Sequence, residues 1–302
     1  MIADLTRRRF LGLAAGAAAV PVFGRFGGVA FGRQAAEAAK GPEIPGGFRL
    51  GVATYSFIKF PLDKALAMMN ELGLVWAEVN PKHFPDFYTA NVRDQAVHPA
   101  DFEKSAKLGE YKALFAKAGI TPWAHGVVYF SKDHGPDVQR ARCAFAKAMG
   151  FRLVSVDYDP EVGDSLETIA GEHGLLLGIH NHGPGSRFDK LVSVQKALEG
   201  RKPHFGATVD VGHVLRAGEN PVDWVKALGP RVHGIHLKDV MPDGKTRAIP
   251  GKGQLKLKDL LAALKEIKYP GVLSIEHEAN MDDPLPEMKQ YLPAVREAAQ
   301  GL

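Results

Sequence analysis

The sequence of 302 residues predicts an α/β fold of the (β/α)8 type, the TIM barrel. From residue 48 onward, short apolar runs alternate with amphipathic helical stretches, which is the pattern of βα units. Eight such units over residues 48–302 match the usual size of this barrel. A doubly wound open sheet is the rival fold. It favours a glycine-rich turn after the first strand, and "GVATYSFIKF" has none.

The eight expected strands are short apolar runs bounded by turn residues or helical patterns. They cover residues 48–54, 74–80, 120–126, 152–157, 175–182, 205–211, 231–237 and 271–277. Between them, segments such as "PLDKALAMMNELG" repeat apolar residues every three or four positions and end in Gly, as amphipathic helices do. A last helix is expected over "LPEMKQYLPAVREAAQ".

Two of the connections that follow strands are unusually long. They cover residues 81–100, after the second strand, and 240–256, after the seventh. In a barrel, the loops that follow the carboxyl ends of strands surround the active site. We therefore expect both connections to overhang the functional face.

The first 38 residues read as a twin-arginine-type signal peptide. Arg7, Arg8 and Arg9 precede an apolar run that is too short to span a membrane, and 36–38 (Ala-Glu-Ala) offer a cleavage site. A linker over 39–47 and one barrel domain over 48–302 would follow. The sequence thus predicts a periplasmic protein without stable membrane insertion after cleavage, or a tethered one if the signal is retained.

The net charge and the cysteine content limit the kinds of partner and site that the chain can have. The net charge is +4, and removal of the first 38 residues, which hold five Arg, one Asp and one Glu, leaves about +1. Such a balance gives no indication of a nucleic-acid partner. Cys143 is the single cysteine, so an intrachain disulfide and a cysteine-based zinc site are excluded. It lies in a helical pattern and is expected to be a small buried apolar residue.

Four consecutive expected strands finish with side chains that bind metals. His180 and His182 end the fifth strand, Asp210 the sixth, His236 the seventh and Glu276 the eighth. Carboxyl ends of barrel strands converge on one mouth, so these side chains are expected to meet there. Two imidazoles and two carboxylates suit a divalent ion that keeps positions open for substrate. A network of buried polar residues that satisfy one another is the alternative.

Three blocks carry a resemblance to a known family. "TVDVGH" (208–213), "GIHLKD" (234–239) and "SIEHE" (274–278) resemble the xylose-isomerase-like TIM-barrel superfamily of sugar isomerases and epimerases, over residues 48–300. The resemblance implies a metal-dependent enzyme that acts on a sugar. It also implies the metal ligands, which match His180, Asp210, His236 and Glu276 here. His213 and Lys238 are carried over as residues that contact the substrate or support the ligands.

One position departs from the family pattern. Relatives that epimerise ketoses usually have Glu where this chain has His180, in "HNH". Imidazole keeps a ligand but removes one carboxylate that could move a proton at carbon. The sequence therefore leaves two reactions open: isomerisation or epimerisation of a ketose or keto-sugar, and a lyase, dehydratase or hydratase reaction on 3-keto-sugars or glycosides. Two His ligands favour Mn, Co, Fe or Zn over Mg.

The expected chemistry is removal of a proton next to a carbonyl. An ion at the carbonyl oxygen would stabilise the developing negative charge. His182, Glu276 or Glu278 could be the base, and Lys238 could add positive charge or donate a proton. The residues expected to hold sugar hydroxyls are Glu78, Lys82, His125, His213 and Glu278.

Other functions fit the sequence less well. An exported sugar-binding protein usually has two lobes, whereas these strands read as one series. An abasic-site endonuclease of the same superfamily would need a basic groove for phosphate. A small sugar is thus the expected partner, and the sequence leaves open whether copies form a homo-oligomer.

Overall fold

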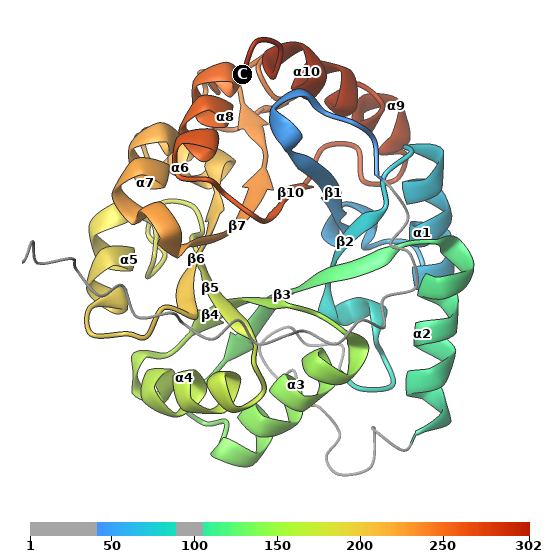
Figure 1. Cartoon of the computed structure of the whole chain (residues 1–302), viewed down its shortest axis with the longest axis vertical. Coiled ribbons are helices and arrows are strands. Elements are labelled where there is room, and N and C mark those ends of the chain that lie inside the picture. Colours follow the sequence, from blue (N-terminus) through green and yellow to red (C-terminus); the bar gives the residue numbers. More distant parts are fainter. Residues whose placement is uncertain (1–40, 89–104) are drawn as a thin grey trace, which may run out of the picture. The chain divides into compact units, whose positions relative to one another are not determined.

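The computed structural model describes residues 41–88 and 105–302, and within them eight parallel strands close into a barrel (Figure 1). Around the barrel the strand order is β1-β10-β7-β6-β5-β4-β3-β2, so the first and last strands pair. The predicted (β/α)8 barrel is confirmed. The barrel strands are β1 Arg49–Ala53, β2 Trp76–Val79, β3 Thr121–Phe130, β4 Leu153–Tyr158, β5 Leu176–His180, β6 Phe205–Asp210, β7 Val232–Leu237 and β10 Val272–Ile275.

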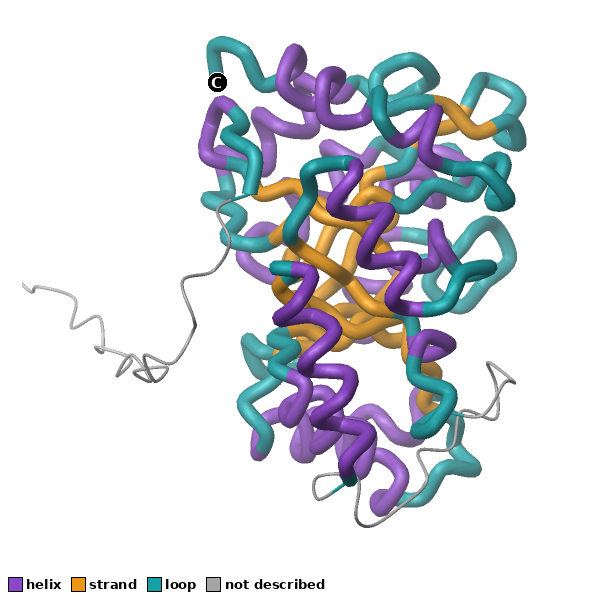
Figure 2. The backbone as a smooth tube through the Cα atoms, turned by 90° about the vertical axis from the view of Figure 1, so that its right-hand side faces the viewer, coloured by secondary structure: helices purple, strands orange, loops and turns teal. Residues whose placement is uncertain are grey.

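Helices cover the outside of the barrel, as Figure 2 shows from the side. Two of them, α2 and α3, end at Gly119 and Gly150, whose positive φ angles of 68° and 89° suit glycine. The expected last helix is divided in two at Gln290. The described helices are α1 Leu62–Glu71, α2 Ala106–Ala118, α3 Pro136–Met149, α4 Gly163–Glu172, α5 Leu191–Leu198, α6 Val211–Arg216, α7 Pro221–Leu228, α8 Leu257–Glu266, α9 Leu285–Met288 and α10 Tyr291–Ala298.

Small residues let the strands approach closely in the barrel interior. A Cβ atom at Gly178 of β5 would lie only 2.2 Å from Oγ1 of Thr208 on β6, so this position requires glycine. The Thr208 hydroxyl in turn lies 3.0 Å from Oγ of Ser155 on β4. Part of the interior is therefore polar and hydrogen-bonded, next to the predicted functional residues.

The long connection after β7 is an ordered loop that contains a short hairpin. Strands β8, Asp239–Val240, and β9, Arg247–Ala248, pair antiparallel. The buried Asp239 carboxylate accepts backbone N–H bonds of 2.7 to 3.0 Å from four loop residues, Val240, Gly251, Gly253 and Leu255. One side chain thus replaces much of the regular hydrogen bonding that the loop lacks.

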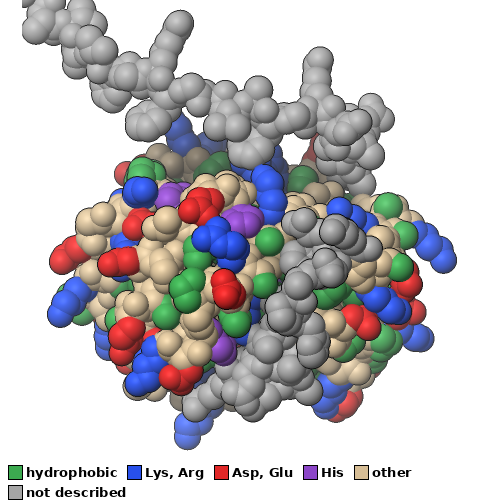
Figure 3. Space-filling view, turned by 90° about the horizontal axis from the view of Figure 1, so that it is seen from below, with side chains coloured by type: hydrophobic (Ala, Val, Ile, Leu, Met, Phe, Trp, Pro, Cys, Tyr) green, Lys and Arg blue, Asp and Glu red, His purple; other side chains and the backbone are tan. Residues whose placement is uncertain are grey.

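Some expectations lie outside the described residues. The predicted signal peptide, 1–38, is among them, and the loop over 81–100 is described only to residue 88. In the described part of the chain, no helix is both long and apolar enough to cross a membrane. On the face drawn in Figure 3, basic and acidic side chains are interspersed. Cys143 is buried on α3, as expected.

Candidate functional site

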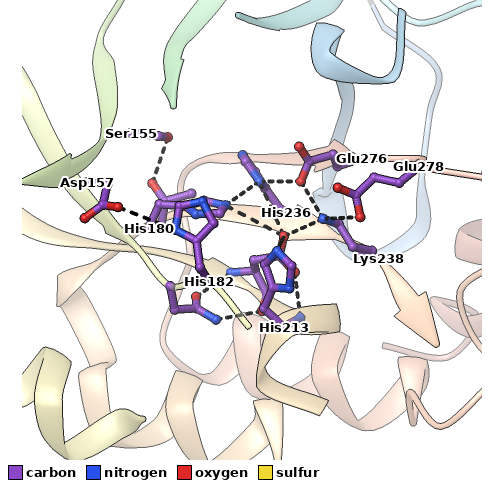
Figure 4. A network of polar contacts seen from close by, with 12 residues as sticks. Ser155, Asp157, His180, His182, His213, His236, Lys238, Glu276 and Glu278 are labelled. Atoms are coloured by element: carbon purple, nitrogen blue, oxygen red, sulfur yellow. Dashed lines mark hydrogen bonds and ion pairs between the residues drawn. The ribbon is translucent and has the colours of Figure 1, made fainter. Parts of the chain in front are cut away.

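The four predicted ligand residues converge at the carboxyl ends of neighbouring strands. One atom from each of His180, Asp210, His236 and Glu276 lies within 4.8 Å of all the others, and all four residues are buried. Nδ1 of His236 lies 3.0 Å from Nε2 of His180 and 3.0 Å from Oε2 of Glu276. Oδ2 of Asp210 lies 3.7 Å from the His180 nitrogen and 3.8 Å from that of His236. We call these four residues the ligand cluster (Figure 4).

Local structure aims the Asp210 carboxylate into the cluster. Asp210 ends β6 and caps α6, since its Oδ1 accepts a 2.8 Å hydrogen bond from the His213 amide. Asn181, which the sequence reading missed, exchanges hydrogen bonds of 2.8 and 3.0 Å with the Asp210 backbone. This exchange ties the end of β5 to the end of β6. The Oδ2 atom remains for the cluster.

The ligand cluster fits a divalent ion. Four tetrahedral ligands bound at about 2.1 Å lie roughly 3.4 Å apart, close to the observed separations. Oδ2 of Asp210 is buried and accepts no hydrogen bond of good geometry, and the Lys238 ammonium 2.9 Å away shows that positive charge is favoured beside this oxygen. Nitrogen and oxygen donors in equal number suit Zn, Mn, Co or Fe.

A buried carboxylate supports the His236 ligand from behind. Oε1 of Glu78, on β2, lies 2.9 Å from Nε2 of His236, and Glu78 is only 2% exposed. Gly126 makes room, because a Cβ there would lie 2.8 Å from that oxygen. Burial alone would lower the pKa of His236, but the Glu78 and Glu276 carboxylates raise it well above its usual value. The Glu78 side chain therefore faces His236 in the barrel interior, whereas the sequence predicted that it would lie at the barrel mouth.

A buried lysine shares oxygens with the cluster. Nζ of Lys238 lies 2.9 Å from Oδ2 of Asp210, 2.8 Å from Oε2 of Glu276 and 3.2 Å from Oε2 of Glu278. Burial opposes its charge, but these three carboxylates raise its pKa, so the ammonium stays protonated. Arg247 of β9, which the sequence reading missed, approaches Glu278 to 2.6 Å and links the loop to this site.

Two further imidazoles border the cluster. His182 follows the end of β5; its ring centre lies 4.6 Å from that of His180, and its side chain is 42% exposed. Burial, and then His180 and His213, lower the pKa of His182 to about 3, so its ring is neutral at pH 7. His213 lies on α6 with Nε2 3.8 Å from Oδ2 of Asp210. Burial is the main cause that lowers its pKa to about 4.

One residue predicted to bind substrate belongs to the core, and another is an exposed turn residue after β2. His125 is fully buried; its Nδ1 lies 2.8 Å from the Val79 carbonyl and its Nε2 2.7 Å from the Tyr88 hydroxyl. The ring also stacks on Phe151, with 5.0 Å between centres. Both nitrogens are occupied, so His125 has none for a sugar and belongs to the core. Lys82 is exposed in the Pro81–His83 turn.

The chain belongs to the xylose isomerase-like TIM barrel family, which it matches over residues 66–298. It is 30% identical over 261 residues to an inosose dehydratase of Mesomycoplasma hyopneumoniae, with 72% of this chain and 81% of that protein covered. A Clostridium botulinum inosose dehydratase is 28% identical over 137 residues, or 38% of this chain. An uncharacterized Methanocaldococcus jannaschii protein is 30% identical over 141 residues, or 43% of this chain. This chain spans about half the length of these last two relatives, 44% of the Clostridium protein and 46% of the Methanocaldococcus protein.

Solved structures show the same fold. The IOLI protein, with a bound zinc atom, superposes with a TM-score of 0.65 at 17% identity, covering 84% of this chain and all of that one. A D-psicose 3-epimerase gives the same TM-score at 14% identity, with the same coverage. At these identities the likeness concerns the fold alone. The family includes isomerases, epimerases and dehydratases.

Proposed function

We propose that this protein is a divalent-metal-dependent lyase that removes water from a neutral cyclic ketone bearing several hydroxyls, such as a keto-sugar or an inosose. The observation that carries the proposal is the ligand cluster with the Lys238 ammonium 2.8 Å from one of its oxygens. This arrangement provides a cation site and a proton donor side by side. The inosose dehydratase relatives support the choice of dehydration.

His180, Asp210, His236 and Glu276 would hold the ion, and Glu78 would orient His236. When bound, the ion would supply positive charge beside a carbonyl oxygen and so make the neighbouring C–H more acidic.

The residues around the cluster would move the protons. His182 would take the proton from the carbon next to the carbonyl, because it is partly exposed at the mouth and its ring is neutral; its lowered pKa makes it a weak base in the metal-free protein. The C–H electron pair forms a C=C bond, and the C–O bond of the hydroxyl on the next carbon breaks. Lys238 gives its proton to the departing hydroxide, which leaves as water. Solvent returns a proton from His182 to Lys238, so the overall products are an enone and water.

Charge balance favours a substrate without phosphate or carboxylate. Lys238 already faces three carboxylates, and Arg247 lies 2.6 Å from Glu278. Arg187, beyond β5, lies 2.7 Å from Asp159. Each of these three cations faces a carboxylate of the protein, so an anionic substrate would find little unpaired positive charge among them. Sugar hydroxyls, in contrast, can bond to such pairs without a change in net charge. Arg216 differs from these three cations, because its contact is with the His213 imidazole.

The test combines metal replacement with product analysis. Protein stripped by a chelator is reloaded with Mn, Co, Zn or Mg and incubated in deuterated water with an inosose, a 3-keto-glycoside and a ketose. Enone absorbance that depends on metal supports the proposal. Deuterium at carbon without loss of water would instead show the isomerase or epimerase that the sequence first suggested.

Two variants make this test specific. Glu276→Gln removes a ligand charge and should lower turnover at least about 100-fold with the fold intact. Its matched control is Glu172→Gln, the same change at an exposed position of α4 that pairs with Arg140. Full activity of Glu276→Gln would overturn the proposal.

Export through the twin-arginine pathway is part of the same proposal. Its support is the sequence around Arg7–Arg9. Folding before export would let the ion be loaded in the cytoplasm. Replacement of Arg7 and Arg8 by Lys should retain the protein in the cytoplasm, as fractionation would show.

A further inference from the structure

Arg216 and His213 are joined by a hydrogen bond that determines where a proton sits. Nη1 of Arg216, the last residue of α6, lies 3.0 Å from Nδ1 of His213. A guanidinium has only donors, so the imidazole nitrogen must accept. In a neutral ring with Nδ1 as acceptor, the proton is on Nε2.

The protonated nitrogen is the one that faces the ligand cluster. Nε2 of His213 lies 3.8 Å from Oδ2 of Asp210, and the backbone of His213 is fixed because its amide donates to Oδ1 of the same carboxylate at 2.8 Å. The ring centres of His213 and His182 are 5.8 Å apart. The Nε2–H group therefore points toward the ligand cluster, beside which the proposed substrate would bind (Figure 4).

His236 has the opposite arrangement. Its Nε2 faces the Glu78 carboxylate, a pure acceptor, so Nε2 carries a proton, and with an ion bound the Nδ1 lone pair would face that ion. A carboxylate behind one imidazole thus makes it a ligand. A guanidinium behind the other keeps a proton on the inward nitrogen, which cannot then bind a metal.

We propose that Arg216 is a positioning residue that holds His213 in the neutral Nε2–H form, so that His213 donates a hydrogen bond to the substrate oxygen where negative charge develops. The contribution to turnover rests on the proposed function, but the proton position does not. Gly183 supports the arrangement, because a Cβ there would lie 3.0 Å from Nη1 of Arg216. A side chain at residue 183 would press on this guanidinium.

Nitrogen NMR of the zinc-loaded and the metal-free protein, labelled with ¹⁵N-histidine, tests the proton position directly. His213→Gln identifies the His213 signals by their loss. We expect Nδ1 of His213 to resonate as an unprotonated nitrogen and Nε2 as a protonated one. The reverse pattern in the native protein would overturn the proposal, whatever its activity.

Three variants of Arg216 separate the donor from simple packing. Arg216→Lys keeps a donor and should keep the Nε2–H form. Arg216→Met removes the donor and should give a mixture of both forms, whereas Arg216→Glu offers an acceptor and should move the proton to Nδ1. Unchanged His213 signals in the folded Met and Glu variants would contradict the assignment.

Kinetics then test the catalytic consequence. Loss of one hydrogen-bond donor to a developing oxyanion typically lowers kcat by about 10²–10³-fold. We expect a fall of this size in Arg216→Glu, with little change in KM, and recovery in Arg216→Lys. If the proton moves but kcat does not, His213 is not the donor. If the native protein turns over none of the ketones, the proposed function fails while the NMR result stands.

Discussion

The Glu78 carboxylate and the His236 imidazole meet at 2.9 Å, although β2 and β7 are not neighbours in the barrel. The contact therefore reaches across the barrel interior, and both side chains are almost completely buried. A carboxylate behind a ligand imidazole fixes the orientation of the ring and makes its free nitrogen more basic. Glu78 thus belongs functionally with the ligand cluster, although it contributes no atom to it.

Replacement of Glu78 should weaken metal binding. We expect Glu78→Gln, which keeps the shape but not the charge, to lower the affinity for Zn or Mn about 10–100-fold, the usual effect of losing such a partner. Titration calorimetry with each metal measures this effect. Glu266→Gln, at an exposed position that pairs with Lys226, is the matched control and should bind as the native protein does. Equal affinities in the two variants would contradict the role of Glu78.

Replacement of Lys238 should destabilise the metal-free protein far more than the loaded one. Without the ammonium, Asp210 and Glu276 lose the cation between them, and breaking a buried pair in this way costs about 3–5 kcal/mol. A bound divalent ion supplies positive charge to the same two carboxylates, so it should restore much of this loss. Urea unfolding of Lys238→Met with chelator and with zinc measures both states.

The control for Lys238 is Lys226→Met. Lys226 forms an exposed pair with Glu266 at 3.5 Å, so its loss should change the free energy of unfolding by less than about 1 kcal/mol, with or without metal. If zinc stabilises Lys238→Met no more than it stabilises the native protein, the ion does not replace the lysine charge between Asp210 and Glu276.

Asp239 should control the order of the loop over 240–256. Asp239→Ala leaves four backbone N–H groups without their acceptor, three of them at Gly251, Gly253 and Leu255. Hydrogen exchange at these amides should become at least about tenfold faster, since each lost buried hydrogen bond costs about 1–3 kcal/mol. Asp243→Asn, at an exposed position in the same loop, should leave their exchange unchanged. Slow exchange in Asp239→Ala would show that the loop is held by other contacts.

His125 should make stability depend on pH. Burial lowers its pKa from 6.5 to about 4, so between these values the unfolded chain binds more protons than the folded one. The stabilisation is complete above pH 6.5 and is lost as the pH falls through 4. At 1.36 kcal/mol per pKa unit, the loss is about 3 kcal/mol.

Urea unfolding with chelator present, at several pH values from 4 to 7.5, measures this loss. His125→Gln can donate to the Val79 carbonyl and accept from the Tyr88 hydroxyl, but it does not titrate. The variant should be less stable than the native protein at pH 7, and this difference in the free energy of unfolding should disappear near pH 4. A constant difference at all pH values would exclude His125 as the source.

The eight strands and the ligand cluster could be predicted from sequence because one rule governs both. Strand periodicity places the barrel, and barrel geometry brings the strand ends that carry His180, Asp210, His236 and Glu276 together. The distances between the four side chains depend on where each strand ends, which only the structure shows.

The sequence predicted that the third strand ends next to His125, but β3 does not end there. The strand continues to Phe130, with a register shift between His125 and Val128. His125 is therefore a mid-strand residue that packs among aromatic rings. A bulge of this kind leaves no signal in the alternation of apolar residues.

Arg247 and Arg216 could not be assigned from sequence for a different reason. Arg247 is placed by a hairpin with two paired residues on each side, too short for any periodicity. Arg216 reads as an ordinary polar residue at the end of a helix. Its contact with His213 depends on the fold of one turn of α6.

All four ligand residues lie on, or directly after, the last four barrel strands in chain order, β5, β6, β7 and β10, whereas β1–β4 contribute none. The second half of the barrel therefore carries the whole ligand cluster. Consider a chimera that joins β1–β4 of a relative to this chain from α4 onward. The residues that β1–β4 contribute around the site would change, while the four ligand residues would stay together. The relative must have an acidic residue at the position of Glu78. Such chimeras would test whether the first half of the barrel selects the proposed substrate.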